Sequence, residues 1–93
     1  MIIGYLGLEI YLPGSHSLKE KRKQLNKFRD RLKSKYNVSF AEIDFQDKWQ
    51  RSKLGIITIN SRKHVVENIL HQIIREAEEK IDGEILNKDI DFF

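Results

Sequence analysis

The sequence predicts an α+β domain in which two helices pack on a four-stranded antiparallel sheet. Two long segments, which begin near Ser17 and Ser61, place apolar residues at helical spacing. Four shorter segments are rich in branched and aromatic residues and alternate as strands do. Pro13-Gly14 and Asp82-Gly83 are turn signals between these segments. Residues 1–93 are enough for a single domain with one modest hydrophobic core.

The first strand is expected from Ile2 to Leu12 and leads into the strongest helix signal in the chain. Ser17 is a good N-cap, and Glu20, three residues on, completes a capping box. The helix should run to about Tyr36 and end at Asn37, a residue that tolerates the left-handed conformation. Its buried stripe covers roughly 80° of the helix surface and consists of Leu18, Leu25, Phe28, Leu32 and Tyr36.

The second half of the chain supplies two central segments, a second helix and a last strand. Ser61 is expected to cap the second helix, and Gly83 to end it. The expected strands are Val38–Phe45, Lys53–Asn60 and Glu84–Phe93, the last with Leu86, Ile90 and Phe92 on one face. The order is therefore β-α-β-β-α-β. Right-handed crossovers then give the ferredoxin-like split βαβ fold, with both helices on one face of the sheet.

Positive charge is concentrated in the first helix. The chain has 17 Lys and Arg against 14 Asp and Glu, and nine of those cations lie between Ser17 and Tyr36 with only two acids. A helix N-terminus normally prefers acids, so cations there indicate an anion or phosphate site. The alternative is a solvated face that aids solubility. Candidate anion- and nucleic-acid-binding residues are Ser17, Lys19, Lys21, Arg22, Lys23, Asn26, Arg29 and Lys33, with His16 beside them.

Lys21 differs from the other cations of this helix. Its helical angle places it near the apolar stripe, so it should lie at the mouth between helix and sheet. One interpretation is a functional role at that mouth. The other is that its amino group reaches past the apolar side chains to water.

Helices on one side leave the other face of the sheet uncovered. Its expected residues are Tyr5, Glu9, Tyr11, Phe40, Glu42, Asp44, Leu54 and Ile56. An apolar patch of this kind indicates an interaction surface, with a homodimer as the natural form. Alternatively, loops or the C-terminal Asp91-Phe92-Phe93 cover it. The acids on this face repel phosphate, so RNA should not bind there.

Trp49, the single tryptophan, lies in a polar connection between two strands. Tryptophan is favoured as an interface anchor, which groups Trp49 with the protein-interface candidates Tyr5, Tyr11, Phe40, Leu54 and Ile56. The alternative is that its ring plugs the open end of the core.

Several classes of function lack support in the sequence. There is no cysteine, and no nucleophile–base pair is visible. Glu9, Glu42, Asp44 and Asp47 could bind a hard cation, but their spacing matches no recognised loop, so neither metal nor cofactor is expected. No segment has the ~18 apolar residues of a membrane span, and no signal peptide is visible. A cytoplasmic location is expected.

Six short motifs are spread along nearly the whole chain: Leu12-Pro13, Ser17-Leu18-Lys19-Glu20-Lys21-Arg22, Tyr36-Asn37-Val38-Ser39, Ala41-Glu42-Ile43-Asp44, Gln46-Asp47-x-Trp49-Gln50 and Leu54-Gly55. Together they resemble the YlxP-like family of small bacterial domains of unknown function. The resemblance implies a ferredoxin-like fold and a gene setting often near ribosome-maturation factors. It supplies no catalytic residues. Glu84 to Phe93 matches the family pattern least well.

The sequence therefore predicts a non-enzymatic domain that binds RNA or a ribosomal particle through the basic first helix. The alternative is a self-associating protein-interaction module that uses the open sheet face and the Trp49 loop. A hydrolase ranks third.

Overall fold

Six elements follow in the predicted order, and the computed structural model describes all residues, 1–93. They are β1 (Ile2–Tyr11), α1 (Leu18–Lys35), β2 (Val38–Asp44), β3 (Arg51–Asn60), α2 (Lys63–Lys80) and β4 (Glu84–Phe92). The strands form one sheet in the order β2-β3-β1-β4, with every neighbouring pair antiparallel. The α+β, ferredoxin-like prediction is confirmed.

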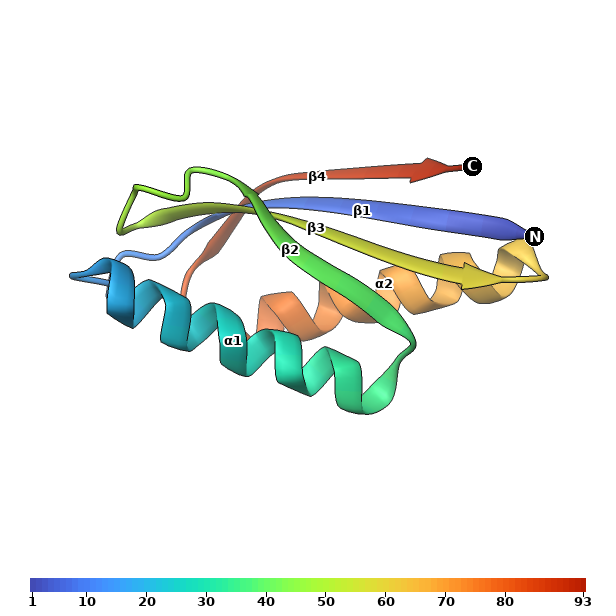
Figure 1. The fold of residues 1–93 in the computed structure, drawn as a ribbon, viewed down its shortest axis with the longest axis horizontal. Helices are drawn as coiled ribbons and strands as arrows, with labels where there is room; N and C mark the ends of the chain where they lie inside the picture. Colours follow the sequence, from blue (N-terminus) through green and yellow to red (C-terminus); the bar gives the residue numbers. More distant parts are fainter.

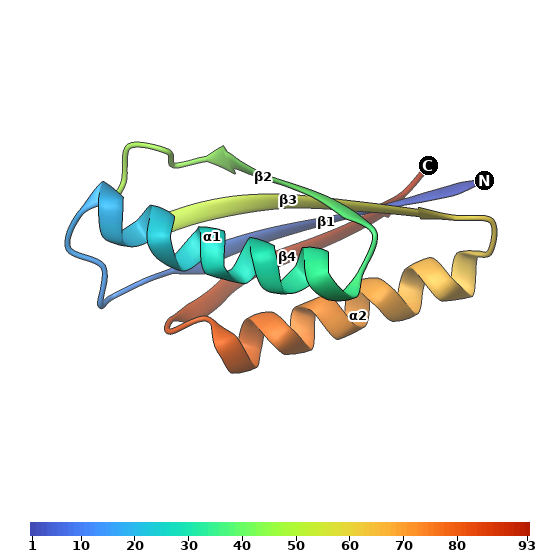
Figure 2. The ribbon, with the colours of Figure 1, turned by 60° about the horizontal axis from the view of Figure 1, so that its bottom comes forward.

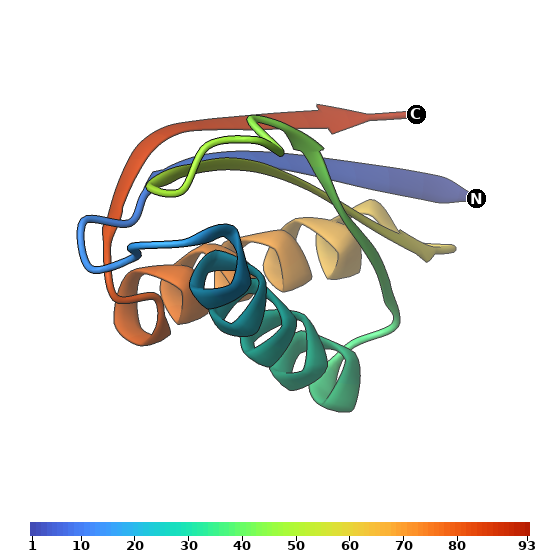
Figure 3. The same ribbon diagram turned by 60° about the vertical axis from the view of Figure 1, so that its left-hand side comes forward.

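Both helices lie on one face of the sheet, and the other face is open (Figure 1, Figure 3). Figure 2 shows the two helices side by side under the sheet; α1 lies next to β2, and α2 lies next to β1, β3 and β4. The two termini are neighbours at one end of the sheet. The β2–β3 loop and the start of α1 lie at the opposite end (Figure 1). The Trp49 loop therefore lies at the same end as the start of α1, whereas the other interface candidates belong to the sheet.

The core forms between the sheet and the helices, as the alternation in the first strand predicts. Leu6, Leu8, Ile10 and Leu12 are fully buried. The helices contribute the stripe residues Leu25, Phe28, Leu32, Val66, Leu70, Ile73, Ile74 and Ala77. Burial of such side chains contributes roughly 1.5–3 kcal/mol each. The strands β2 and β4 add partly buried side chains, such as Phe40 and Ile85, that pack against this cluster.

The faces predicted for β2 and β3 were wrong, because residues expected on the open face lie in the core. Leu54 and Ile56 of β3 are fully buried in the core rather than on the open face. Phe40 also packs inward, with its ring centroid 6.2 Å from that of Phe28. Register gives the reason, because paired residues share a face: Leu6 pairs with Ile56, and Ile56 pairs with Phe40. Both faces of β3 are apolar, so its pattern alone could not choose between them.

Bulges account for two other departures in the sheet. One in β4, where Glu9 pairs with Asn87 but Ile10 pairs with Ile85, leaves Leu86 without a partner. Leu86 therefore does not share a face with Ile90 and Phe92 as expected. A second bulge, in β2 between Glu42 and Asp44, likewise leaves Ile43 without a partner on β3. A bulge re-aims the side chains that follow it, which a period-two reading cannot anticipate.

The helix ends agree with the sequence at one of four points. Ser17 is the N-cap of α1 and accepts the Glu20 N–H at 3.0 Å. The Glu20 carboxylate, however, accepts from the His16 N–H rather than that of Ser17. Arg62, not Ser61, precedes α2 and makes no side-chain cap. Neither C-terminus uses a left-handed residue, because both helices end in extended backbone and no Asn or Gly has positive φ.

Candidate functional site

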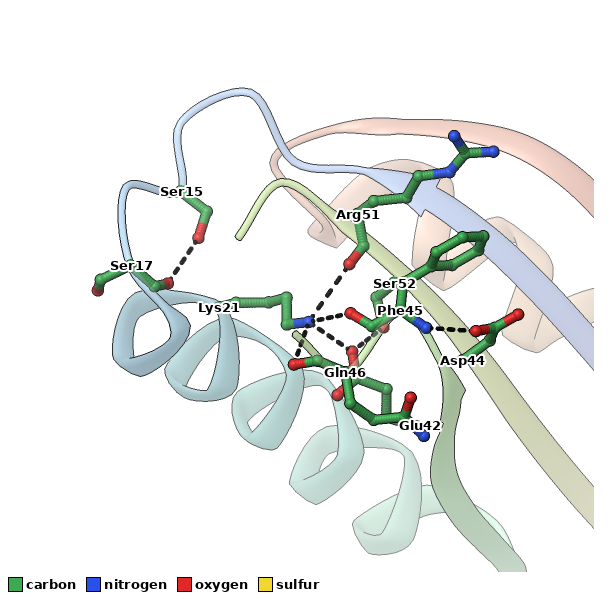
Figure 4. Close-up of polar contacts among 9 residues, drawn as sticks. All are labelled: Ser15, Ser17, Lys21, Glu42, Asp44, Phe45, Gln46, Arg51 and Ser52. Carbon is green, nitrogen blue, oxygen red and sulfur yellow. Dashed lines mark hydrogen bonds and ion pairs between the residues drawn. The ribbon is translucent and has the colours of Figure 1, made fainter. Parts of the chain in front are cut away.

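Lys21 is fully buried at the end of the molecule where α1 begins. Its Nζ lies 2.8 Å from Glu42 Oε2 and donates to the carbonyl oxygens of Phe45 (2.8 Å), Gln46 (3.3 Å) and Arg51 (3.3 Å) (Figure 4). The expectation that this side chain reaches water was wrong. A lysine survives burial only with a full set of partners, and the carbonyls that close the β2–β3 loop supply them. Lys21 is therefore unavailable to an external anion.

The loop held by Lys21 has a conformation that most residues avoid. Phe45 has φ of 60° and is the only residue with positive φ. Its N–H donates to Asp44 Oδ1 at 2.7 Å, and its carbonyl accepts both Lys48 N–H (3.0 Å) and Lys21 Nζ. A left-handed aromatic residue costs about 1–3 kcal/mol and persists only where its surroundings fix it. The hydrogen bonds on both sides of Phe45 do so, and the loop is fixed in one shape.

Beside this loop the surface has an open, aromatic-lined recess of about 590 Å³. Trp49, Tyr11 and Leu86 contribute exposed apolar surface, and Trp49 is 55% exposed. The interpretation of Trp49 as a plug of the core is therefore wrong. Arg51 stacks its guanidinium 4.6 Å from the Phe45 ring centroid and donates to Glu9 at 2.9 Å. Lys48, Gln50 and one acid, Asp47, complete the lining.

Part of the positive charge on α1 is already paired within the protein. Arg31 and Lys35 both reach Glu76 of α2, at 2.9 and 2.7 Å. Arg29 pairs with the neighbouring Asp30 at 3.0 Å. Glu76 is buried where the two helices meet. The two contacts to Glu76 join α1 to α2, and the pair with Asp30 engages Arg29, the one residue of the three that belongs to the candidate anion site.

Glu76 shows how strongly these partners act. Burial alone raises the pKa of its carboxyl group. Hydrogen bonds from Lys35 and Arg31, together with their positive charges, outweigh burial, so the pKa lies below its ordinary value. Its Oε2 atom has no hydrogen-bond partner. The group is therefore a structural anion whose charge the two cations balance.

The remaining cations of α1 face solvent. Exposed side chains that form no ion pair are Lys19, Arg22, Lys23, Lys27 and Lys33. Four of them border one shallow recess together with Asn26 and Asp30. At the helix start, the Ser17 side chain accepts the N–H of Glu20. Positive charge is presented on the exposed side of α1 from its first turn, at Lys19, to its last turn, at Lys33.

The four acids considered as metal ligands are dispersed. Glu42 lies on the helix side, paired with Lys21 and accepting from Ser52 at 2.6 Å. Glu9 is paired with Arg51 on the open face. No three His, Asp or Glu side chains gather in a way that could hold a metal ion. The strand alternation placed Glu42 on the wrong face, which is why the sequence suggested a cluster.

On the open sheet face, Tyr5 fills a space left by two glycines. Gly7 and Gly55 are paired across β1 and β3. A Cβ on Gly7 would lie 2.7 Å from the Tyr5 hydroxyl oxygen, and one on Gly55 would lie 3.1 Å from Ile43. Around this centre Ile43, Ile57 and Ile59 are each more than 40% exposed. The predicted apolar face exists, but its residues come from the other set of alternating positions on β3.

Sequence reasoning missed Phe45, Leu86 and Glu76 as members of these sites. The first two depend on a backbone outlier and a bulge, for which the sequence has no signal. For Glu76 the sequence gives only a weak signal, which is a carboxylate near the C-terminal end of an apolar stripe. Of the predicted interface residues, Tyr5, Tyr11 and Trp49 reach the open face or the recess, whereas Phe40, Leu54 and Ile56 lie in the core.

Neither helix is long and apolar enough to span a bilayer. The arrangement defines a small ferredoxin-like domain with a bare sheet face, a basic helix and an aromatic-lined end. Residues 3–90 match the family model described as "Protein of unknown function (DUF503)". The chain belongs to this family. It is 37% identical over 73 residues to "Uncharacterized protein YlxP" of Bacillus subtilis strain 168, covering 78% of this chain and 79% of that protein.

Two solved structures share the fold at low identity. The structural genomics protein YJCS is 12% identical, with a TM-score of 0.61 and 96% of each chain covered. The de novo designed protein Ferredog-Diesel is 17% identical, with a TM-score of 0.54 over 96% of this chain and 83% of the designed one. At these identities the likeness concerns the fold alone.

Proposed function

We propose that this domain is a binding protein rather than an enzyme, and that it binds RNA, free or within a ribosomal particle, through the exposed side of α1. The observation that carries the proposal is the set of exposed, unpaired cations: Lys19, Arg22, Lys23, Lys27 and Lys33. The protein pairs Lys21, Arg31 and Lys35 internally and leaves these five to solvent. A set of exposed cations on one helix suits a phosphate backbone.

Binding of this type has a characteristic energetic form. Each phosphate neutralised by a Lys or Arg releases counterions, so affinity falls steeply as salt rises. Contacts to phosphate position the protein but read no sequence. We therefore expect α1 to supply affinity and to be tolerant of RNA sequence.

The test is fluorescence anisotropy with a labelled structured RNA, from low to physiological salt. The variant Lys19→Glu/Arg22→Glu/Lys23→Glu should lose about tenfold or more in affinity and show a shallower salt dependence. A matched control, Arg62→Glu/Arg75→Glu/Lys80→Glu, makes the same change in net charge on and beside α2. Equal weakening by both variants would show that net charge, not the α1 surface, drives binding. No binding to the wild type at low salt would sink the proposal.

A second candidate is self-association through the open sheet face. Ile43, Ile57 and Ile59 are exposed on adjoining strands, and Phe93 beyond β4 is 70% exposed. Burial of apolar surface is not screened by ions, so a dimer of this kind should persist at high salt. Analytical ultracentrifugation of the wild type and of Ile57→Glu would test it. A monomer at all accessible concentrations would eliminate this candidate.

A further inference from the structure

The recess beside Trp49 combines three features that the α1 surface does not explain. It contains exposed aromatic surface, its loop is fixed by buried contacts, and it lies at the same end of the molecule as the start of α1 (Figure 1). Its volume of about 590 Å³ is within the ~300–1,000 Å³ of small-ligand sites. A tryptophan exposed in such a loop presents a large flat ring of the kind that serves as a binding anchor.

We propose that this recess binds an unpaired nucleobase, which stacks on Trp49 between Tyr11 and Leu86. This inference deepens the proposed function and rests on it: α1 would hold the phosphates, and the recess would hold a base of the same strand. Aromatic rings that bind single-stranded nucleic acid act in this way, because every base has a flat π-face.

Rigidity supports the assignment. Lys21 donates to three carbonyls of the loop that carries Trp49, and the Phe45 carbonyl also accepts Lys48 N–H. Gln50 adds two ties to the segment after β1, since its Nε2 donates to the Pro13 carbonyl (3.2 Å) and its carbonyl accepts the Leu12 N–H (2.8 Å). A platform fixed before binding loses little conformational entropy when a ligand arrives.

The connection between the recess and α1 supports a nucleotide as the occupant. Arg51 lines the recess but is paired with Glu9, and Lys48 is matched by the single acid Asp47, so the cations that would meet the phosphates are those of α1. The ammonium group of Lys21, buried behind the loop, ties the recess directly to the first turns of α1. Lys19 and Arg22 lie in those same turns (Figure 4 shows the junction). One RNA strand that passes from α1 to the recess would contact both surfaces. This would explain why the two surfaces lie at the same end of the molecule.

Trp49 is the only tryptophan, so its emission reports on the recess directly. We expect a short single-stranded RNA to quench this emission, whereas inorganic polyphosphate, which has charge but no bases, should bind α1 without quenching. Trp49→Ala should weaken binding of labelled single-stranded RNA about tenfold and leave the slope of log affinity against log salt unchanged. Trp49→Phe should restore part of the loss. Ile90→Ala, a control at an exposed apolar residue of β4 outside the recess, should bind as the wild type does.

Other outcomes overturn the inference and remain distinct from failure of the proposed function. Equal affinity of Trp49→Ala and wild type, or equal quenching by polyphosphate, would eliminate base stacking while leaving binding by α1 intact. Emission that shifts with protein concentration alone would assign the recess to a second copy of the chain. If the Lys19→Glu/Arg22→Glu/Lys23→Glu variant binds normally but Trp49→Ala does not, the placement on α1 fails and the recess stands. No binding of RNA overturns both.

Discussion

Lys21 Nζ and Glu42 Oε2 lie 2.8 Å apart, across the boundary between α1 and β2. The lysine is fully buried, and the side chain of Glu42 is 18% exposed. Because the same amino group donates to three loop carbonyls, this pair connects the basic helix to the loop that carries Trp49. The two surfaces to which we assign binding are therefore mechanically joined.

Lys21→Met should destabilise the fold by about 3 kcal/mol or more, since it leaves a half-buried carboxylate and loop carbonyls without their partner. The measurement is urea denaturation followed by circular dichroism. Amide exchange should also speed up selectively between residues 45 and 50. Lys23→Met, on the exposed side of the same helix, should change stability by less than about 0.5 kcal/mol. Equal effects of the two variants would contradict the assigned role of Lys21.

Gly83→Ala should destabilise the protein by about 1–3 kcal/mol, because its new methyl group has no room. A Cβ at this position would lie 2.2 Å from the Tyr11 carbonyl oxygen, a backbone atom that cannot move aside easily. Gly14→Ala is the matched control, since the nearest atom to its Cβ would be 3.7 Å away and its φ is not positive. Thermal unfolding of the two variants checks the difference. A Gly83→Ala protein as stable as Gly14→Ala would refute the close approach.

Much of the fold could be predicted because its signals are local. The Ser17 cap, the apolar stripes of both helices and the alternation of β1 each follow from a few neighbouring residues. Element order then restricts the topology to few choices. The face of β3 could not be predicted in this way, because Leu54 and Ile56 compete with the equally apolar Ile57 and Ile59. Only pairing with β1 decides between them.

The candidate sites were less predictable, because they depend on contacts between distant segments. Lys21 was recognisable as unusual from its helical angle, but its partners lie 21 to 30 residues away along the chain. Glu76 meets Arg31 and Lys35 over 45 and 41 residues. The Phe45 conformation results from those contacts rather than from its own preference. Sequence patterns identified the basic helix and Trp49, but not how many cations the protein itself uses.

The assignment of the β3 faces can be checked with two neighbouring isoleucines. Ile56 is fully buried and Ile57 is 43% exposed. Ile56→Ala should cost about 2–5 kcal/mol, since it leaves a cavity in the core. Ile57→Ala should cost less than about 1 kcal/mol. Denaturant titrations give both values, and the reverse ranking would mean that β3 presents its other face to the helices.

The ion pairs of Glu76 predict how stability depends on pH. Its folded pKa lies below the ordinary value, so the ionised carboxylate stabilises the fold. That contribution is fully present above the ordinary pKa of about 4.3 and is lost as pH falls through the lower folded pKa. Glu76→Gln removes the charge that Arg31 and Lys35 share. The variant should be about 2 kcal/mol less stable at neutral pH and should lose less stability than the wild type between neutral and acidic pH.

Glu79→Gln, an exposed neighbour that forms no ion pair, should follow the wild-type pH profile. If Glu76→Gln also follows that profile, the carboxylate does not couple the two helices.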